Sequence, residues 1–178
     1  LFASTDGRSY LIQARRLAAY LQAGLLVPTE EEALTVRATR EALPGGESTG
    51  LEPFRVEALE LGLDAGSAEH LLLHYGSETP AVLNLVRGDR DLGRRLVPEH
   101  PAIAATVVQA VRREYATSVE DVLVRRIHLY YEVGDQGCGA APAVAELMGR
   151  ELGWDAATGA RAAADYVARI GNGGFSEE

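Results

Sequence analysis

The stretch IAATVVQAVRREYATSVEDVLVRRIHL, residues 103–129, decides the fold of this 178-residue chain. In its first half, Ile103–Tyr115, apolar residues recur every three or four positions, a spacing that places them on one side of an α-helix. They are Ile103, Val107 and Val111. This half therefore predicts an amphipathic helix at the centre of the domain.

The second half of the same stretch predicts another helix. Ser118 and Asp121 have the spacing of a capping box, in which two side chains bond the free main-chain N–H groups at a helix start. We expect this helix to run through Leu129 or Tyr131.

Capping and helix-breaking residues divide most of the remaining chain into short helices. These helices are expected at Ala68–Tyr75 with Ser67 as N-cap, behind Thr79-Pro80 with Thr79 as N-cap, at Pro142–Leu152, and from Asp155 to Gly171. No run of alternating β-branched residues between turn signals is found in the sequence. The sequence therefore predicts an all-α fold, a compact multi-helix domain that resembles a bundle.

A segment rich in breakers precedes this domain. Tyr10–Ala23 has near-helical apolar spacing and predicts an extra N-terminal helix. Residues 28–50 contain Pro44-Gly45-Gly46 and are typical of a linker. We expect two parts, an N-terminal helix with its linker in residues 1–50 and a helical domain in residues 51–178.

Two opposite charges fall on apolar helix faces. Glu114 lies within the stripe of the first helix, and Arg126 lies on the apolar face of the second, whereas Arg125 points away. That second face comprises Val119, Val122, Leu123, Ile127 and Tyr130. Because a lone charge removed from water is costly, we expect Glu114 and Arg126 to form a buried clasp, ideally a two-pronged contact of guanidinium with carboxylate. The alternative is that the pair faces a substrate or cofactor of a neighbouring domain.

Composition excludes several classes of protein. The 17 basic and 26 acidic residues give a formal charge of −9, which disfavours nucleic acid as a partner. All 17 basic residues are arginines, so Schiff-base chemistry and a phosphate-loop lysine are excluded from this chain. No apolar run reaches the roughly 18 residues that span a bilayer. The single cysteine, Cys138, is typical of a reducing compartment, and we expect a cytoplasmic protein.

The sequence predicts no catalytic, cofactor-binding or metal-binding residue. His70 and His74 stand four apart, a spacing that allows two imidazoles to share a metal. No third ligand accompanies them, so we interpret them as two partly exposed helix histidines, and His100 and His128 belong to no motif. The loop Gly137-Cys138-Gly139 lacks the preceding strand of a dinucleotide-binding loop.

Five segments form an ordered series from about residue 40 to 170. They are Ala42-Leu43-Pro44-Gly45-Gly46, Leu72–Ser77, Leu96-Val97-Pro98, Val107–Leu129 and Glu151–Asp155. In order and spacing, this series resembles the C-terminal domain of FAD-dependent glycerol-3-phosphate dehydrogenases and the related oxidases. The residues that match the family most closely are Glu114, Asp121, Arg125 and Arg126.

The resemblance implies a parent enzyme that converts sn-glycerol 3-phosphate to dihydroxyacetone phosphate and passes electrons through FAD to a quinone or oxygen. This chain would be the helical cap of its partner, the flavin-binding catalytic domain, with residues 1–50 as a remnant of the junction. Any membrane association would be peripheral and through the parent, on the cytoplasmic face. Arg125 and Asp121 are candidates for an interface or a phosphate-facing position. The alternative is a stand-alone helical interaction module without catalysis.

The agreement with the family ends upstream of the linker. Family members carry a Gly-Lys-x-Thr-Thr-Tyr-Arg segment that helps to hold the flavin. In the register set by the linker, its Lys, Thr, Thr, Tyr and Arg positions fall on Tyr10, Ile12, Gln13, Ala14 and Arg15. Only Arg15 matches, so we expect this chain alone to bind no FAD and to oxidise nothing.

Overall fold

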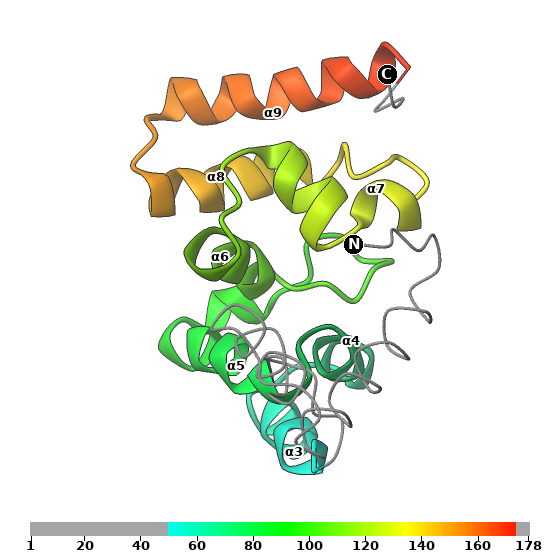
Figure 1. Cartoon of the computed structure of the whole chain (residues 1–178), viewed down its shortest axis with the longest axis vertical. Coiled ribbons are helices and arrows are strands. Elements are labelled where there is room, and N and C mark those ends of the chain that lie inside the picture. The colour runs from blue at the N-terminus through cyan, green and yellow to red at the C-terminus, as the bar shows by residue number, and fades with distance from the viewer. Residues whose placement is uncertain (1–49, 174–178) are drawn as a thin grey trace, which may run out of the picture. The chain divides into compact units, whose positions relative to one another are not determined.

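The computed structural model describes residues 50–173, so the expected N-terminal helix Tyr10–Ala23 and its linker lie outside the described residues. The described part contains seven α-helices and no strand (Figure 1): α3 (Glu52–Glu60), α4 (Ala65–Tyr75), α5 (Thr79–Gly88), α6 (Ala104–Arg113), α7 (Leu129–Glu132), α8 (Ala141–Leu152) and α9 (Ala156–Gly171). It also contains a π-helix, η3 (Asp121–Arg126), and two 3-10 turns, η1 (Gly76–Glu78) and η2 (Arg90–Gly93). The all-α prediction is confirmed.

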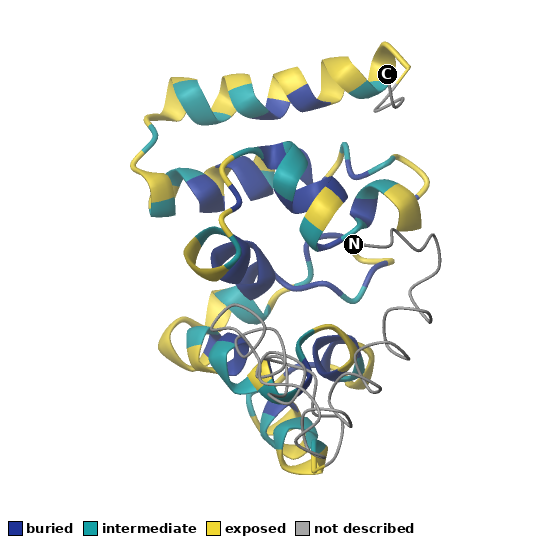
Figure 2. Cartoon of the chain, viewed as in Figure 1, coloured by how far each residue is buried: buried dark blue, intermediate teal, exposed yellow. Residues whose placement is uncertain are grey.

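Helix α6 is central because its residues contribute to two apolar cores. The first core joins α6 to η3, α7, α8 and α9, and its largest fully buried side chains include Leu123, Ile127, Leu129 and Met148. The second core joins α3, α4 and α5 to Ile103 and Ala105 at the start of α6. Figure 2 shows the buried residues along the sides of α4, α6 and α8 that face other helices. The apolar stripe therefore predicted the central helix correctly.

Helices α4 and α5 begin at different residues from those expected. Asp64 is the N-cap of α4, since its Oδ1 accepts a hydrogen bond of 3.0 Å from the main-chain N–H of Ser67. The hydroxyl of Thr79 donates to the carbonyl of Leu71 at 3.2 Å and caps nothing, because Thr79 is already the first residue of α5. Both predicted N-caps were wrong, although both helices exist.

The capping box after α6 is confirmed. The main-chain N–H of Asp121 donates to the Ser118 hydroxyl, and the main-chain N–H of Ser118 donates to Asp121 Oδ2, each at 3.0 Å. The helix that follows is shorter than predicted. It widens into the π-helix η3 and ends there, because His128 adopts a left-handed backbone with φ of 58°. A separate helix, α7, then starts at Leu129.

The last two helices lie side by side and agree with the prediction (Figure 1). Helix α8 ends at Gly153, whose φ of 70° is a left-handed conformation that glycine adopts without strain. Asp155 then caps α9 by accepting a 2.7 Å hydrogen bond from the N–H of Thr158. Within residues 50–173, no helix has both the length and the apolar character required to cross a membrane.

Candidate functional site

Glu114 and Arg126 meet where α6 ends. Nε and Nη2 of Arg126 donate to the main-chain carbonyl oxygen of Glu114 at 3.1 and 2.8 Å. The Glu114 carboxylate is further away, with Oε2 3.6 Å from Arg126 Nε. Their side chains are 28% and 33% exposed, so the pair is half-buried. The sequence predicted a two-pronged contact on the carboxylate, and the structure places it on the main chain.

The end of α6 explains this difference. Glu114 is the C-cap of α6, and the last carbonyl groups of a helix lack partners within it. A guanidinium suits this position because it supplies donors and its positive charge opposes the negative end of the helix dipole. Burial raises the pKa of Glu114, and the nearby Arg126 partly offsets that rise. The arrangement is therefore an arginine cap of a helix end, and the carboxylate is secondary to it.

Asp121 and Arg125 lie in a network of charges at the start of η3. Asp121 Oδ1 accepts a 2.9 Å bond from Arg125 Nη1, and Arg125 also pairs with Glu120. Glu120 in turn forms an ion pair with Arg169 of α9, whose Nη1 lies 3.2 Å from Glu120 Oε2. Burial alone would raise the pKa of Asp121, but hydrogen bonds from Thr117 and Ser118 outweigh it and lower that pKa. This network ties α9 to η3; a role of Asp121 and Arg125 at an interface or phosphate stays a prediction.

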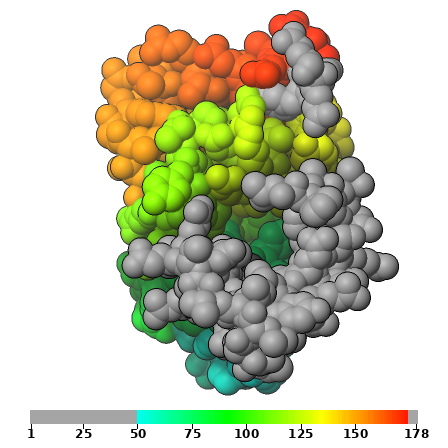
Figure 3. Space-filling model, viewed as in Figure 1, coloured from blue at the N-terminus to red at the C-terminus, as the bar shows by residue number. Residues whose placement is uncertain are grey.

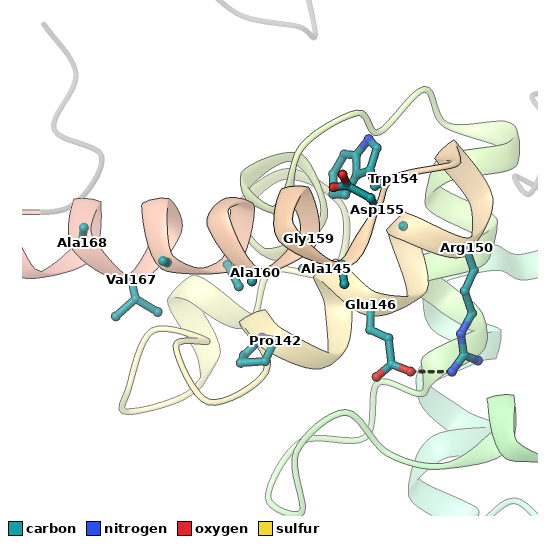
Figure 4. A pocket seen from close by; sticks show the side chains of 14 residues that line it. Pro142, Ala145, Glu146, Arg150, Trp154, Asp155, Gly159, Ala160, Val167 and Ala168 are labelled. Carbon is teal, nitrogen blue, oxygen red and sulfur yellow. Dashed lines mark hydrogen bonds and ion pairs between the residues drawn. The ribbon is translucent and has the colours of Figure 1, made fainter.

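A groove of about 910 Å³ runs between α8 and α9 (Figure 4). Most of its lining is alanine, glycine, proline or valine, and Trp154 lies at the turn between the two helices. Glu146 and Arg150 form an ion pair on α8 at its edge, as Figure 4 shows. The side chains lining the groove offer few hydrogen-bonding groups, so the groove is suited to apolar contact and not to chemistry.

The structure brings four histidines together, which the sequence analysis did not foresee. His70 and His74 of α4 have ring centroids 4.0 Å apart. His100, from the segment before α6, lies 5.1 Å from His70, and His128, before α7, lies 6.2 Å from His74. We call these four residues the histidine cluster. Within residues 50–173, no three histidine, cysteine or acidic side chains are arranged to hold a metal ion.

The environments within the cluster differ. His70 is 8% exposed, so describing it as a partly exposed histidine was wrong, whereas His74 is exposed. Burial first, and then the neighbouring His74 and His100, lower the pKa of His70 to about 4. The Nε2 of His100 lies 2.7 Å from Glu132 Oε2. No motif revealed the cluster, because its members are up to about sixty positions apart and helix periodicity reports only on neighbours within one helix.

Cys138 lies in the turn before α8. Burial, followed by the charge of Asp135, raises the pKa of its thiol, which is the opposite of the activation that a nucleophilic cysteine requires. The Asp135 carboxylate accepts main-chain N–H groups of Gly137 and Gly139 at 2.9 and 2.6 Å and so shapes the turn. These contacts explain the loop Gly137-Cys138-Gly139 as a turn held by Asp135.

Comparison with known proteins places residues 36–159 within the family described as the C-terminal domain of alpha-glycerophosphate oxidase. The chain is 31% identical over 115 residues to a glycerol-3-phosphate dehydrogenase of Synechocystis, covering 64% of this chain and 21% of that protein. It is 32% identical over 125 residues to glycerol-3-phosphate dehydrogenase 2 of Mycobacterium tuberculosis, covering 70% and 19%.

A third relative is the human mitochondrial glycerol-3-phosphate dehydrogenase, which is 38% identical over 100 residues, covering 54% of this chain and 14% of that protein. The aligned region thus spans about a fifth or less of the length of these relatives. No solved structure matches the chain.

Proposed function

Since this chain belongs to the family of the C-terminal domain of alpha-glycerophosphate oxidase, we propose that it is the helical cap of an FAD-dependent glycerol-3-phosphate dehydrogenase. The whole enzyme would convert glycerol 3-phosphate to dihydroxyacetone phosphate and deliver electrons to a quinone or to oxygen. The observation that carries the proposal is the family match over residues 36–159, in relatives of which the aligned region forms only a small part.

We propose that FAD binds outside residues 50–173. Dinucleotide-type cofactors bind where a glycine-rich turn joins a parallel strand to a helix, and residues 50–173 form no strand. The flavin would therefore belong to a separate catalytic domain, the partner of this chain. The role left to the present residues is to support that domain, and none of them is assigned to the oxidation itself.

The surface supports a cap more than a stand-alone module. The groove between α8 and α9 is apolar and open. Uncovered apolar surface is typical of a protein that has a partner. The single cysteine supports a reducing compartment, and we propose the cytoplasm, with any membrane contact made through the whole enzyme.

Reconstitution tests this proposal. The chain is mixed with the separately produced flavin-binding domain of its parent, and glycerol 3-phosphate oxidation is followed with an artificial electron acceptor. We expect co-elution in gel filtration, a higher melting temperature of the flavin domain and a higher rate of oxidation. An unrelated helical protein at the same concentration is the control. If the chain does no more than that control, the cap role is wrong and the module becomes the better explanation.

A further inference from the structure

The histidine cluster joins the two apolar cores. His70 and His74 belong to α4, which packs in the second core through Leu71. His100 and His128 belong to segments that pack in the first core, as does Leu129 of α7. Contacts within the cluster thus connect α4 to the segments around α7, and a change of charge in the cluster acts on this connection.

Both ring nitrogens of His100 form hydrogen bonds in the folded structure. The main-chain N–H of Ala102 donates to Nδ1 of His100 at 3.1 Å, so Nδ1 carries no proton. The proton must then be on Nε2, which donates to Glu132 Oε2 at 2.7 Å. Protonation of His100 would place a second proton on Nδ1 and break the bond from Ala102. The folded arrangement of His100 therefore depends on a free lone pair at Nδ1.

His70 also resists protonation in the folded state. It is buried, and the titratable groups facing it are His74 on its own helix, His100 on the segment before α6, His128 before α7 and Glu132 on α7. Of these, only the Glu132 carboxylate favours a positive charge on His70. Glu132 bonds directly only to His100, and a positive charge on His70 would lie close to the rings of His74 and His100, which oppose it.

We propose that the histidine cluster is a proton-sensitive latch that releases α4 from the segments of His100 and His128 in mild acid. The ring centroid of the exposed His74 lies 4.0 Å from that of the buried His70, so the cluster reaches from the solvent to the buried ring. Release exposes His70, whose protonation is opposed by burial in the closed arrangement. Proton uptake and opening are therefore coupled, and each favours the other.

Hydrogen exchange at single amides tests the latch. The probes are the amides of Leu71 and Leu72 in α4, with those of Ala163 and Tyr166 in α9 as an internal reference, because α9 contributes no histidine. Between pH of about 7 and about 4.5, we expect protection in α4 to fall by roughly tenfold or more beyond any fall in α9. An equal fall in both helices would be global unfolding and would overturn the proposal.

Two variants separate the latch from other acid effects. In the double variant His74→Gln/His128→Gln, the imidazoles outside the buried part of the cluster are replaced by amides, which take up no proton, and the acid-induced fall in α4 protection should become at least roughly threefold smaller. In the control Glu114→Gln, which removes a carboxyl group with a raised pKa outside the cluster, the fall should be unchanged. An unchanged fall in the double variant, or its loss in the control, contradicts the latch.

Discussion

Arg126 holds Glu114 by its main chain: Nη2 lies 2.8 Å from the carbonyl oxygen of Glu114, whereas the carboxylate oxygen is 3.6 Å from Nε. The contact therefore fixes the end of α6 whatever the charge on the Glu114 side chain. The contact needs the guanidinium of Arg126 but not the carboxylate of Glu114. Substitutions of the two residues should therefore change the free energy of unfolding by unequal amounts.

Arg126→Ala should destabilise the domain far more than Glu114→Gln. Loss of Arg126 leaves a half-buried carbonyl without its charged donor, which costs about 2 kcal/mol. Glu114→Gln leaves the main-chain contact in place and should change the free energy of unfolding by less than about 0.5 kcal/mol, as expected of a partly exposed ion pair. Urea denaturation of both variants measures the difference. Equal losses would show that the carboxylate is the essential acceptor.

The Glu114–Arg126 contact shows which structural features the sequence pattern predicts and which it does not. Helical projection brought Glu114 and Arg126 to facing sides of neighbouring helices, because apolar periodicity reports which side of a helix is covered. It did not reveal that α6 ends at Arg113. The end is made by Tyr115, whose φ of 58° is a left-handed conformation usually signalled by glycine or asparagine.

The other differences between prediction and structure also arise from features that helix periodicity does not report. The widening of the helix at η3 breaks the 100° spacing on which projection depends, so a single long helix was predicted where η3 and α7 lie. The histidine cluster depends on tertiary packing between segments far apart in sequence. The local capping bonds at Ser118 and Asp155 were predicted correctly, whereas the N-caps expected at Ser67 and Thr79 were wrong because α4 and α5 begin earlier than the apolar pattern indicated.

Tyr115→Gly should stabilise the domain. The Tyr115 side chain is 90% exposed, so its removal loses little packing, whereas its left-handed backbone carries a strain of about 1 kcal/mol that glycine does not have. Tyr115→Ala is the matched control, because alanine removes the ring and keeps the strain. Thermal and urea unfolding should rank the glycine variant above the wild type by up to about 1 kcal/mol and the alanine variant near it. If glycine and alanine are equally stable, backbone strain at this position is unimportant.

The stability of the domain should fall as the pH decreases from 6.5 towards 4. The pKa of His70 is about 4 in the folded protein and 6.5 in its ordinary state, so the unfolded chain binds this proton first and acid favours unfolding. For this residue alone the effect is at most about 3 kcal/mol. Urea denaturation across this range should show a shallower pH dependence in His70→Gln. A variant with the slope of the wild type would mean that His70 is not the group responsible.

Asp64 joins the start of α4 to Arg95, and two substitutions separate its roles. Its carboxylate accepts the Ser67 N–H at 3.0 Å and receives Nε and Nη2 of Arg95 at 3.0 and 2.6 Å. Asp64→Asn keeps an N-cap acceptor and loses the ion pair, which is half-exposed and contributes at most about 1 kcal/mol. Asp64→Ala loses both and should cost about 2 kcal/mol.

The same residue makes an acid-sensitive contribution, because the Arg95 guanidinium holds the pKa of Asp64 well below its usual range. The contribution is present above the ordinary pKa of 3.8 and is lost as the pH falls below it. Wild type and Asp64→Asn should therefore differ in unfolding free energy near neutral pH and converge in strong acid, which denaturation at both pH values measures. Equal destabilisation by Asn and Ala would show that the N-cap bond to Ser67 contributes nothing to the start of α4.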